Sequence, residues 1–211
     1  MRRSVLLFIK WPEAGKVKTR LAATLGGEEA ARIYQRLVDA VLSIVPRDLE
    51  VVILFDPPER RADIKRWLRP RCPGAVFRPQ GSGDLGERLT QGFQEAFASG
   101  SAHVAAIGSD CIELVLSIFA DAWAALETTE CVVGPSEDGG YYLIALREPC
   151  PTLFEGISWS TATVLRQTLD RASATGLRVA LLPQLHDVDD EADWRRAERL
   201  LGGSATERRI G

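Results

Sequence analysis

An acidic side chain directly after a short apolar segment is the first feature that suggests chemistry. The segment 103–107 (HVAAI) is followed by Gly108, Ser109, Asp110 and Cys111. A run this short and apolar is typical of a buried parallel strand. In open α/β sheets, ligands bind in the crevice beyond the carboxyl ends of the strands. The sequence therefore predicts that the Asp110 carboxylate faces a ligand crevice.

A second acidic cluster, Asp187-Val188-Asp189-Asp190, follows another apolar segment near the end of the chain. Magnesium and manganese take oxygen ligands and need only one or two carboxylates, with water and substrate phosphates completing the shell. Asp110 and one aspartate of this cluster would suffice for such a site. The alternative interpretation is that Asp110 caps a helix beginning near Glu113, and that Asp190 caps the last helix.

A loop rich in cations follows the first apolar segment, residues 4–9. Gly15 permits a tight turn, and Lys16, Lys18 and Arg20 alternate, so a partly extended segment would point several cations the same way. A lysine point charge and a planar arginine fork together suit a polyphosphate. A solvated surface loop is the alternative, but the place after a strand's carboxyl end favours phosphate binding.

Two glycine-containing segments are weaker candidates. The loop from Gly81 to Arg88 would let its backbone lie against a nucleobase or ribose, although it matches neither the GxGxxG nor the Walker pattern. Asp84 in this loop is interpreted either as a helix cap or as a ligand contact. The segment 135–142 is a turn entering a strand, and Asp138 with the following tyrosines could face an acceptor.

Strand-like and helix-like segments alternate along the chain. Strands are predicted over 4–9, 49–55, 75–78, 103–107, 130–133, 141–146 and 177–182, and helices over 28–45, 59–68, 113–126, 160–174 and 192–201. A further helix follows the loop 81–86, with Leu89, Phe93, Ala96 and Phe97 on its inward face. Strands separated by helices indicate parallel pairing through right-handed crossovers. We therefore expect an α/β fold with three α/β/α layers and a mostly parallel central sheet. We also expect strands 4–9 and 103–107 to be central neighbours, one domain over 1–201, and a flexible polar tail over 202–211.

Composition excludes several classes of protein. The 211-residue chain has a net charge of −3, with 45% hydrophobic and 26% charged residues, as in ordinary globular proteins. That charge argues against nonspecific nucleic-acid binding. No apolar run approaches the roughly 20 residues that span a bilayer, and the first run is too short for a signal peptide. The four cysteines show no CxxC pairing, so reduced thiols and a cytoplasmic location are expected. His103 and His186 have no metal-ligand spacing and are interpreted as structural.

Several motifs in order resemble one bacterial family. They are FIKWPEAGKVKTRLA, GSGDLGERL, GSDC, VVGPSEDGGYYLIAL, GISWST and HDVDDEADW, spread from Phe8 to Trp194. The chain resembles glycosyltransferase-A-like proteins described as nucleotide-diphospho-sugar transferases. These are similar in fold to the molybdenum-cofactor and phospholactate guanylyltransferases. The resemblance implies a Rossmann-like nucleotide-diphospho-sugar transferase fold.

The resemblance also implies roles for individual residues. The matching nucleotide and phosphate-binding residues are Lys10, Gly15, Lys16, Lys18, Thr19 and Arg20, with Gly83, Asp84 and Gly86 in the second motif. Asp110, Asp189 and Asp187 match the metal-binding positions for Mg²⁺ or Mn²⁺, and Asp110 and Lys18 are the expected catalytic residues. The acceptor side would be lined by Asp138, Gly139, Gly140, Tyr141, Trp159, Ser160 and Thr161.

The chain departs from the family pattern at two places. Ile112 stands where the family has proline, and Val115-Leu116 replaces polar helix-start residues, which predicts a weakened helix start after Asp110. Asp190 and Glu191 replace Thr-Pro, which predicts a looser turn after Asp189.

Three functions remain open at this point. The first is glycosyl transfer from a nucleotide sugar to a small-molecule acceptor, with a metal stabilising the departing nucleoside diphosphate. The second is nucleotidyl transfer from a nucleoside triphosphate, with release of pyrophosphate. The third is nucleotide binding without turnover. The sequence favours a metal-dependent transferase with a nucleotide-activated donor, narrowly the sugar-transferring version; the oligomeric state stays unknown.

Overall fold

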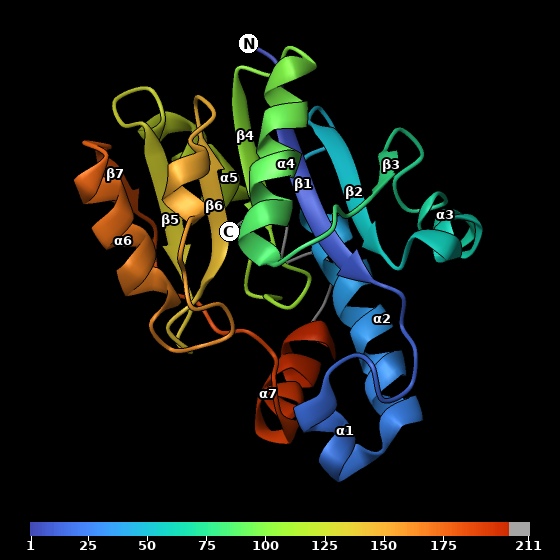
Figure 1. Ribbon diagram of the computed structural model, residues 1–211. Helices are drawn as coiled ribbons and strands as arrows, with labels where there is room; N and C mark the ends of the chain where they lie inside the picture. Colours follow the sequence, from blue (N-terminus) through green and yellow to red (C-terminus); the bar gives the residue numbers. More distant parts are fainter. Residues whose placement is uncertain (203–211) are drawn as a thin grey trace.

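In the described part of the chain, residues 1–202, seven strands form one mixed sheet in the order β3-β2-β1-β4-β6-β5-β7. The structure is a computed structural model, and Figure 1 shows the sheet with its helices. The strands are β1 (Arg3–Lys10), β2 (Glu50–Asp56), β3 (Val76–Pro79), β4 (His103–Ile107), β5 (Cys131–Pro135), β6 (Tyr141–Leu146) and β7 (Val179–Leu181). Strand β6 runs antiparallel to β4 and β5, and the other strand pairs are parallel.

Helices cover both faces of this sheet. Their bounds are α1 (Thr19–Leu25), α2 (Gly27–Ile44), α3 (Arg61–Leu68), α4 (Leu85–Ala98), α5 (Leu116–Ala125), α6 (Val164–Ala174) and α7 (Glu191–Gly202), with short 3₁₀ turns η1 (Pro58–Arg60) and η2 (Pro151–Phe154). Helices α4 and α6 lie on one face, whereas α2, α3 and α5 pack on the other. The result is a three-layer α/β/α molecule, as the alternation of segments predicts.

The central strand shows why the sheet is buried on both sides. Successive side chains of a strand point to opposite faces. In β1, Val5, Leu7 and Ile9 therefore pack into the core beneath α2, while Leu6 and Phe8 pack into the core beneath α4. A strand apolar on both faces has no solvent-facing side, so its carboxyl end is where it can present polar groups.

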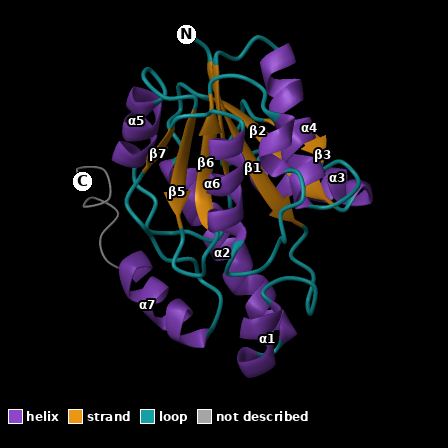
Figure 2. Cartoon of the chain, turned by 60° about the vertical axis from the view of Figure 1, so that its left-hand side comes forward, coloured by secondary structure: helices purple, strands orange, loops and turns teal. Residues whose placement is uncertain are grey.

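A third apolar cluster lies beyond the carboxyl ends of the strands. Leu21 of α1, Leu37 of α2 and Trp194 of α7 are buried together there. Figures 1 and 2 both place α1 and α7 side by side beyond this end of the sheet. This cluster fixes the two segments that carry the basic loop and the second acidic cluster against each other, although they are far apart in the sequence.

The predicted elements are present, with strands β1 and β4 adjacent and central, paired from Arg3↔His103 to Leu7↔Ile107. One strand, β6, differs from the parallel arrangement, because it is antiparallel to both of its neighbours. Only residues 136–140 separate β5 from β6, which is too short for a parallel crossover, so β6 turns back antiparallel. Of the predicted tail 202–211, only Gly202 lies within the described residues, where it ends α7.

Two helices, α5 and α1, also differ from the prediction. Helix α5 begins at Leu116 rather than near Glu113, and its N-cap Val115 makes no side-chain cap, in line with the weakened start that the family departure predicts. The sequence pattern did not predict α1. The segment through Thr19 and Arg20, expected to be partly extended, is helical. In residues 1–202, no helix is long and apolar enough to cross a membrane.

Candidate functional site

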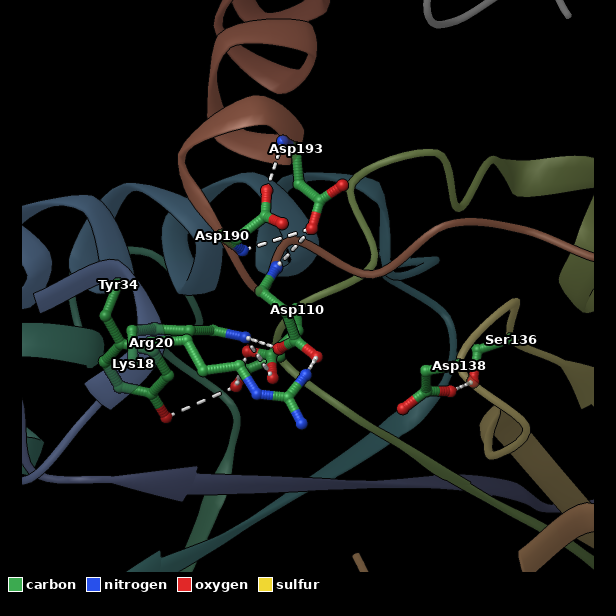
Figure 3. A network of polar contacts seen from close by, with 10 residues as sticks. Lys18, Arg20, Tyr34, Asp110, Ser136, Asp138, Asp190 and Asp193 are labelled. Carbon is green, nitrogen blue, oxygen red and sulfur yellow. Dashed lines mark hydrogen bonds and ion pairs between the residues drawn. The ribbon is translucent and has the colours of Figure 1, made fainter. Parts of the chain in front are cut away.

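The centre of the site is a buried lysine held between two aspartates. The Lys18 ammonium lies 2.8 Å from Asp110 Oδ2 and 3.0 Å from Asp189 Oδ1, and the lysine side chain is only 6% exposed (Figure 3). Burial alone would lower the pKa of Lys18, but the charges of the two aspartates outweigh it and raise that pKa above its ordinary value. Lys18 is therefore a permanently charged group that neutralises the aspartate pair.

Two chain segments bring the aspartates together. Asp110 follows β4, and Asp189 precedes α7. Val188 N donates to the Asp110 carbonyl oxygen at 3.2 Å, which ties the segments directly. Asp110 is not the cap of α5, because that helix starts later, at Leu116. Its carboxylate is thus left for the crevice.

The turn after Asp189 is fixed rather than loosened, which corrects the expectation drawn from the family departure. Asp190 Oδ1 accepts from Asp193 N at 3.0 Å, so Asp190 caps α7 as the alternative interpretation holds. In return, Asp193 Oδ2 accepts from the backbone N–H groups of Asp189 and Asp190 at 3.0 and 3.1 Å. The two carboxylates supply the local hydrogen bonds that make a Thr-Pro turn unnecessary.

The backbone of Lys18 is in an unusual conformation. Its φ and ψ are 46° and 53°, in the left-handed region, and it precedes the first residue of α1. A side-chain-bearing residue in this region costs on the order of 1–3 kcal/mol and persists where its surroundings impose it. Here the Lys18 carbonyl oxygen accepts the first helical bond, from Ala22 N at 2.8 Å. The strained turn sends the chain into α1 and the side chain inward to the aspartates.

Tyr34 of α2 joins the loops after β1 and β4 beneath the site. Its hydroxyl accepts from Lys10 N at 2.9 Å and lies 3.2 Å from Ser109 Oγ, which itself lies 3.1 Å from Asp110 Oδ1. Burial, together with the nearby charge of Asp110, raises the pKa of Tyr34 to about 12. The phenol therefore stays neutral and acts as a fixed hydrogen-bonding group.

A cavity of about 590 Å³ opens over these groups. Of the predicted phosphate-binding residues, Lys10, Lys16, Lys18, Thr19 and Arg20 line it, together with Asp110 and Asp189. Gly15 does not line it but has a φ of 76°, the left-handed turn that glycine permits. The structure thus brings together one end of the basic loop and the two acidic segments at the carboxyl edge of the sheet.

The cations of the loop do not act as one extended row. Lys16 pairs with Glu13 at 2.8 Å and is 70% exposed, and Lys18 is bound to the aspartates. Arg20, in α1, is 75% exposed and lies 3.5 Å from Asp189 Oδ2. Lys10 and Arg20 are therefore the loop cations in the cavity that are most available to an incoming phosphate.

Sequence reasoning missed one cation on the opposite wall. Arg88 lines the cavity, and its guanidinium donates to Gln80 Oε1 at 3.0 Å and to the Gly83 carbonyl oxygen at 3.1 Å. Gln80 is itself fixed, since its amide nitrogen donates to the Ile9 and Leu54 carbonyl oxygens. The GERL motif contained this arginine, but its direction depends on Gln80, which no local pattern reveals.

The other residues of the second motif have structural roles. Asp84 caps α4 in a reciprocal capping box with Glu87, which confirms the cap interpretation. Gly83 has a φ of 91°, and a Cβ at Gly86 would meet the Phe154 carbonyl oxygen and the Trp159 indole. None of these three residues lines the cavity, whereas Leu85, which is 41% exposed, does.

The predicted acceptor side is mostly set back from the cavity. Of its seven residues, Ser160 lines the cavity, with a strained φ of 62°. Tyr141 packs edge-on against Trp159, and Asp138 accepts from Ser136 Oγ and Gly140 N within its own turn. Figure 3 shows Asp138 and Ser136 apart from the Lys18 cluster.

Asp187 is near the aspartate pair but not part of it. It borders a separate, very small cavity with Ile112 and His186. Burial, with the charges of Asp110 and Asp138, raises the pKa of Asp187 to about 7. His186 lies against two glutamates, Glu113 and Glu137, and His103 stacks on Trp123, so both histidines have structural contacts.

Asp110 and Asp189 supply the oxygen donors that magnesium and manganese prefer, but they do not form a complete coordination shell by themselves. Within residues 1–202, no group of three or more His, Cys, Asp and Glu side chains is arranged to hold a metal. Magnesium and manganese bind through one or two carboxylates that are open to a cavity when substrate phosphates complete the coordination shell. Asp110 and Asp189 fit that requirement.

Comparison with known proteins places the chain in a family. Residues 41–161 match the family described as "Uncharacterized protein conserved in bacteria (DUF2064)", and the chain belongs to it. A crystal structure from Desulfovibrio desulfuricans G20, described as a "putative nucleotide-diphospho-sugar transferase", is 33% identical, with a TM-score of 0.89. The match covers 100% of this chain and 92% of that one. No curated protein matched the chain significantly in sequence.

More distant structures share the fold alone. A 4-diphosphocytidyl-2C-methyl-D-erythritol synthase from Anaerococcus prevotii DSM 20548 has a TM-score of 0.62 at 12% identity, covering 95% of this chain and 98% of that one. A CMP:2-keto-3-deoxy-manno-octonic acid synthetase complexed with CTP has a TM-score of 0.58 at 9% identity, with the same coverage of 95% and 98%. The chain therefore has the fold of nucleotide-diphospho-sugar transferases and nucleotidyltransferases.

Proposed function

We propose that the protein is a metal-dependent transferase that uses a nucleotide-activated donor, and that it transfers a sugar from a nucleotide sugar to a small acceptor. The observation that carries the proposal is a single cavity lined by Lys10, Arg20 and Arg88 together with the Asp110–Asp189 pair. Cations beside a carboxylate pair match a ligand that brings phosphates and a divalent cation together. The 33%-identical structure described as a "putative nucleotide-diphospho-sugar transferase" supports the choice of donor.

In this proposal each group has a defined task. Lys10, Arg20 and Arg88 bind the donor phosphates, and charge-assisted hydrogen bonds of this kind are among the strongest that side chains make. Asp110 and Asp189 would hold Mg²⁺ or Mn²⁺, and the ion would supply charge neutralisation to the departing nucleoside diphosphate. The acceptor hydroxyl oxygen bonds to the sugar's anomeric carbon as the bond from that carbon to the diphosphate oxygen breaks; the nucleoside diphosphate leaves with the bonding electrons, and the hydroxyl proton passes to water. Ser160 stands at the cavity wall from which an acceptor would approach.

Nucleotidyl transfer is the second candidate, and one observation favours it. Five cations line the cavity, Lys10, Lys16, Lys18, Arg20 and Arg88, which is more positive charge than a diphosphate requires. In that reaction the acceptor oxygen attacks the α-phosphorus and pyrophosphate leaves. The same residues would then bind a triphosphate.

A thermal-shift screen tests the proposal and separates the candidates. Nucleotide sugars and nucleoside triphosphates are added singly to the protein, with and without MnCl₂. A ligand that binds only the native state raises the melting temperature by mass action. The proposal predicts the largest rise with a nucleotide sugar plus Mn²⁺, whereas a larger rise with a triphosphate favours nucleotidyl transfer.

Turnover is then measured with the best donor and a panel of small hydroxyl and phosphate acceptors. Release of nucleoside diphosphate supports glycosyl transfer, and release of pyrophosphate supports the alternative. Tight metal-dependent binding without any donor consumption would indicate a nucleotide-binding protein without turnover. No stabilisation by any nucleotide would contradict all three.

A further inference from the structure

The position of Lys18 carries an inference about how the site acquires its metal. Three features of this residue are unusual together: a left-handed backbone, a side chain only 6% exposed, and an ammonium that contacts carboxylates from two distant segments. We propose that Lys18 is a resident counter-cation, which occupies the aspartate pair in the ligand-free protein and releases it to a divalent cation when donor phosphates bind the ammonium. The inference rests on the proposed function and deepens it.

The charges at the site support this role. Asp110 and Asp189 carry two negative charges, and Lys18 with Arg20 supplies two positive charges within 3.5 Å of them. A divalent cation alone therefore meets a pair that is already neutralised and must face the Lys18 ammonium at close range. At 4 Å, two unit charges interact with about 1 kcal/mol in water and about 4 kcal/mol at an effective dielectric constant of 20. Repulsion of this size makes metal binding weak while the ammonium stays in place.

The Lys18 ammonium also has a second set of oxygens within the same cavity once donor phosphates are bound. The same cavity is lined by Lys10 and Arg20, where the proposed phosphates bind. The flexible four-carbon stem of a lysine lets its ammonium move while its backbone stays fixed. Lys18 is thus able to exchange carboxylate oxygens for phosphate oxygens without moving α1. Arg20 is largely exposed and its fork lies farther from the pair, so it cannot substitute for Lys18 as the close counter-charge.

The exchange couples the two ligands. Donor phosphates that draw Lys18 away leave the aspartate pair with uncompensated negative charge, which a metal then binds. Coupling between two bound ligands is reciprocal, so the metal must raise donor affinity by the same factor. The consequence for the protein is that metal binds weakly on its own and tightly with donor.

The test measures Mn²⁺ binding alone, without nucleotide, from the electron paramagnetic resonance signal of the free ion. Lys18→Met removes the ammonium and keeps the stem, and it should bind Mn²⁺ about tenfold more tightly than the parent, or better. The matched control is Lys16→Met, which removes the same charge from the same loop at a lysine paired with Glu13. The Mn²⁺ affinity of that control should stay within about twofold of the parent's. Salt screens the charge of an exposed lysine that does not contact the aspartates, so its loss changes the electrostatic potential at the metal site only slightly.

A second variant guards against misfolding, since methionine must also adopt the left-handed backbone of position 18. Lys18→Gly adopts that conformation without strain and should likewise bind Mn²⁺ about tenfold more tightly. Circular dichroism checks that each variant is folded. If the folded Lys18 variants bind Mn²⁺ no more tightly than the parent, the inference is overturned. It is also overturned if Lys16→Met gains as much Mn²⁺ affinity as the Lys18 variants do.

The outcome separates this inference from the proposed function. If the parent binds its donor in a metal-dependent way but neither Lys18 variant binds Mn²⁺ more tightly, the counter-cation role fails and the proposed function stands. If no donor binds the parent with or without Mn²⁺, the proposed function fails. Tighter Mn²⁺ binding in the Lys18 variants would then support only the part of the inference in which Lys18 occupies the aspartate pair, and its release by donor phosphates would be overturned.

Discussion

Two cavities at opposite edges of the sheet have similar size and different character. The site cavity, about 590 Å³, lies at the carboxyl ends of β1 and β4. The second, about 680 Å³, lies at the amino end of β2, where its walls include Leu42, Pro46 and an Asp39–Arg71 ion pair. Within the described residues, the strained Lys18 and the convergent aspartates belong to the first cavity and not to the second.

The difference shows that volume does not define the functional edge of this fold. Parallel strands that are buried on both faces have no room for charged side chains along their length. Polar residues lie in the loops after their carboxyl ends, where segments distant in the sequence meet. At the amino edge the ion pair bridges two neighbouring surface elements and is partly solvated. We therefore expect matched substitutions at the two edges to have different consequences.

The largest effect that separates the two edges is expected at Arg88. Arg88→Met removes a guanidinium that lines the site cavity and is held by Gln80, and it should weaken donor binding by about 1.5–3 kcal/mol, the scale of a charged hydrogen bond. Calorimetric titration with the donor found in the screen measures this loss. The matched control is Arg71→Met at the amino edge, which should leave donor affinity unchanged. Equal losses in both variants would mean that the Arg88 effect is only a change of overall charge.

A smaller effect is expected beneath the site. Tyr34→Phe leaves the packing of α2 intact but deprives Lys10 N and Ser109 Oγ of their shared partner. Loss of one buried hydrogen-bond partner costs about 1–3 kcal/mol. Urea denaturation of the variant should show this loss with an unchanged m-value. A variant as stable as the parent would show that water replaces the hydroxyl and that the loops are held by other contacts.

The smallest effect concerns a partly exposed ion cluster around Glu130 at the surface. Hydrogen bonds from Arg178, with the charges of Arg178 and Arg147, lower the pKa of Glu130 from 4.5 to about 2. Because the folded-state pKa is lower, the stabilising contribution is complete above the unfolded pKa, and it is lost as pH falls from about 4.5 to 2. Glu130→Gln should therefore lose less stability than the parent over that acid range. Denaturation midpoints at several pH values measure the difference, and identical pH profiles would contradict it.

The sequence predicts much of the fold and one half of the site. Periodicity located the strands around 4–9 and 103–107, and the strand-end rule then placed Asp110 and the basic loop at one edge. The pattern failed where tertiary contacts decide. Helix α1 is seven residues long and is held by Leu21 in a cluster with α7, so it has no clear amphipathic period of its own.

The roles of single side chains were the hardest to predict. Lys18 alternates with Lys16 and Arg20 in the sequence, yet its left-handed backbone turns it to the aspartates while its neighbours face solvent. Arg88 depends on Gln80, whose orientation is set by two strand carbonyl oxygens. Each of these directions comes from contacts between segments that are distant in the sequence, which local spacing does not encode.

In the proposed function, the Asp110–Asp189 pair links metal binding to donor binding at the carboxyl edge. The most direct measurement is donor affinity with and without Mn²⁺ in the parent, in Asp110→Asn, and in Asp39→Asn as the same substitution at the amino edge. In the parent and in Asp39→Asn, Mn²⁺ should raise donor affinity by about 5–150-fold, the usual range of coupling between two ligands. In Asp110→Asn, which keeps the shape of the side chain and removes its charge, the rise should disappear. A rise in Asp110→Asn as large as in the parent would contradict the account.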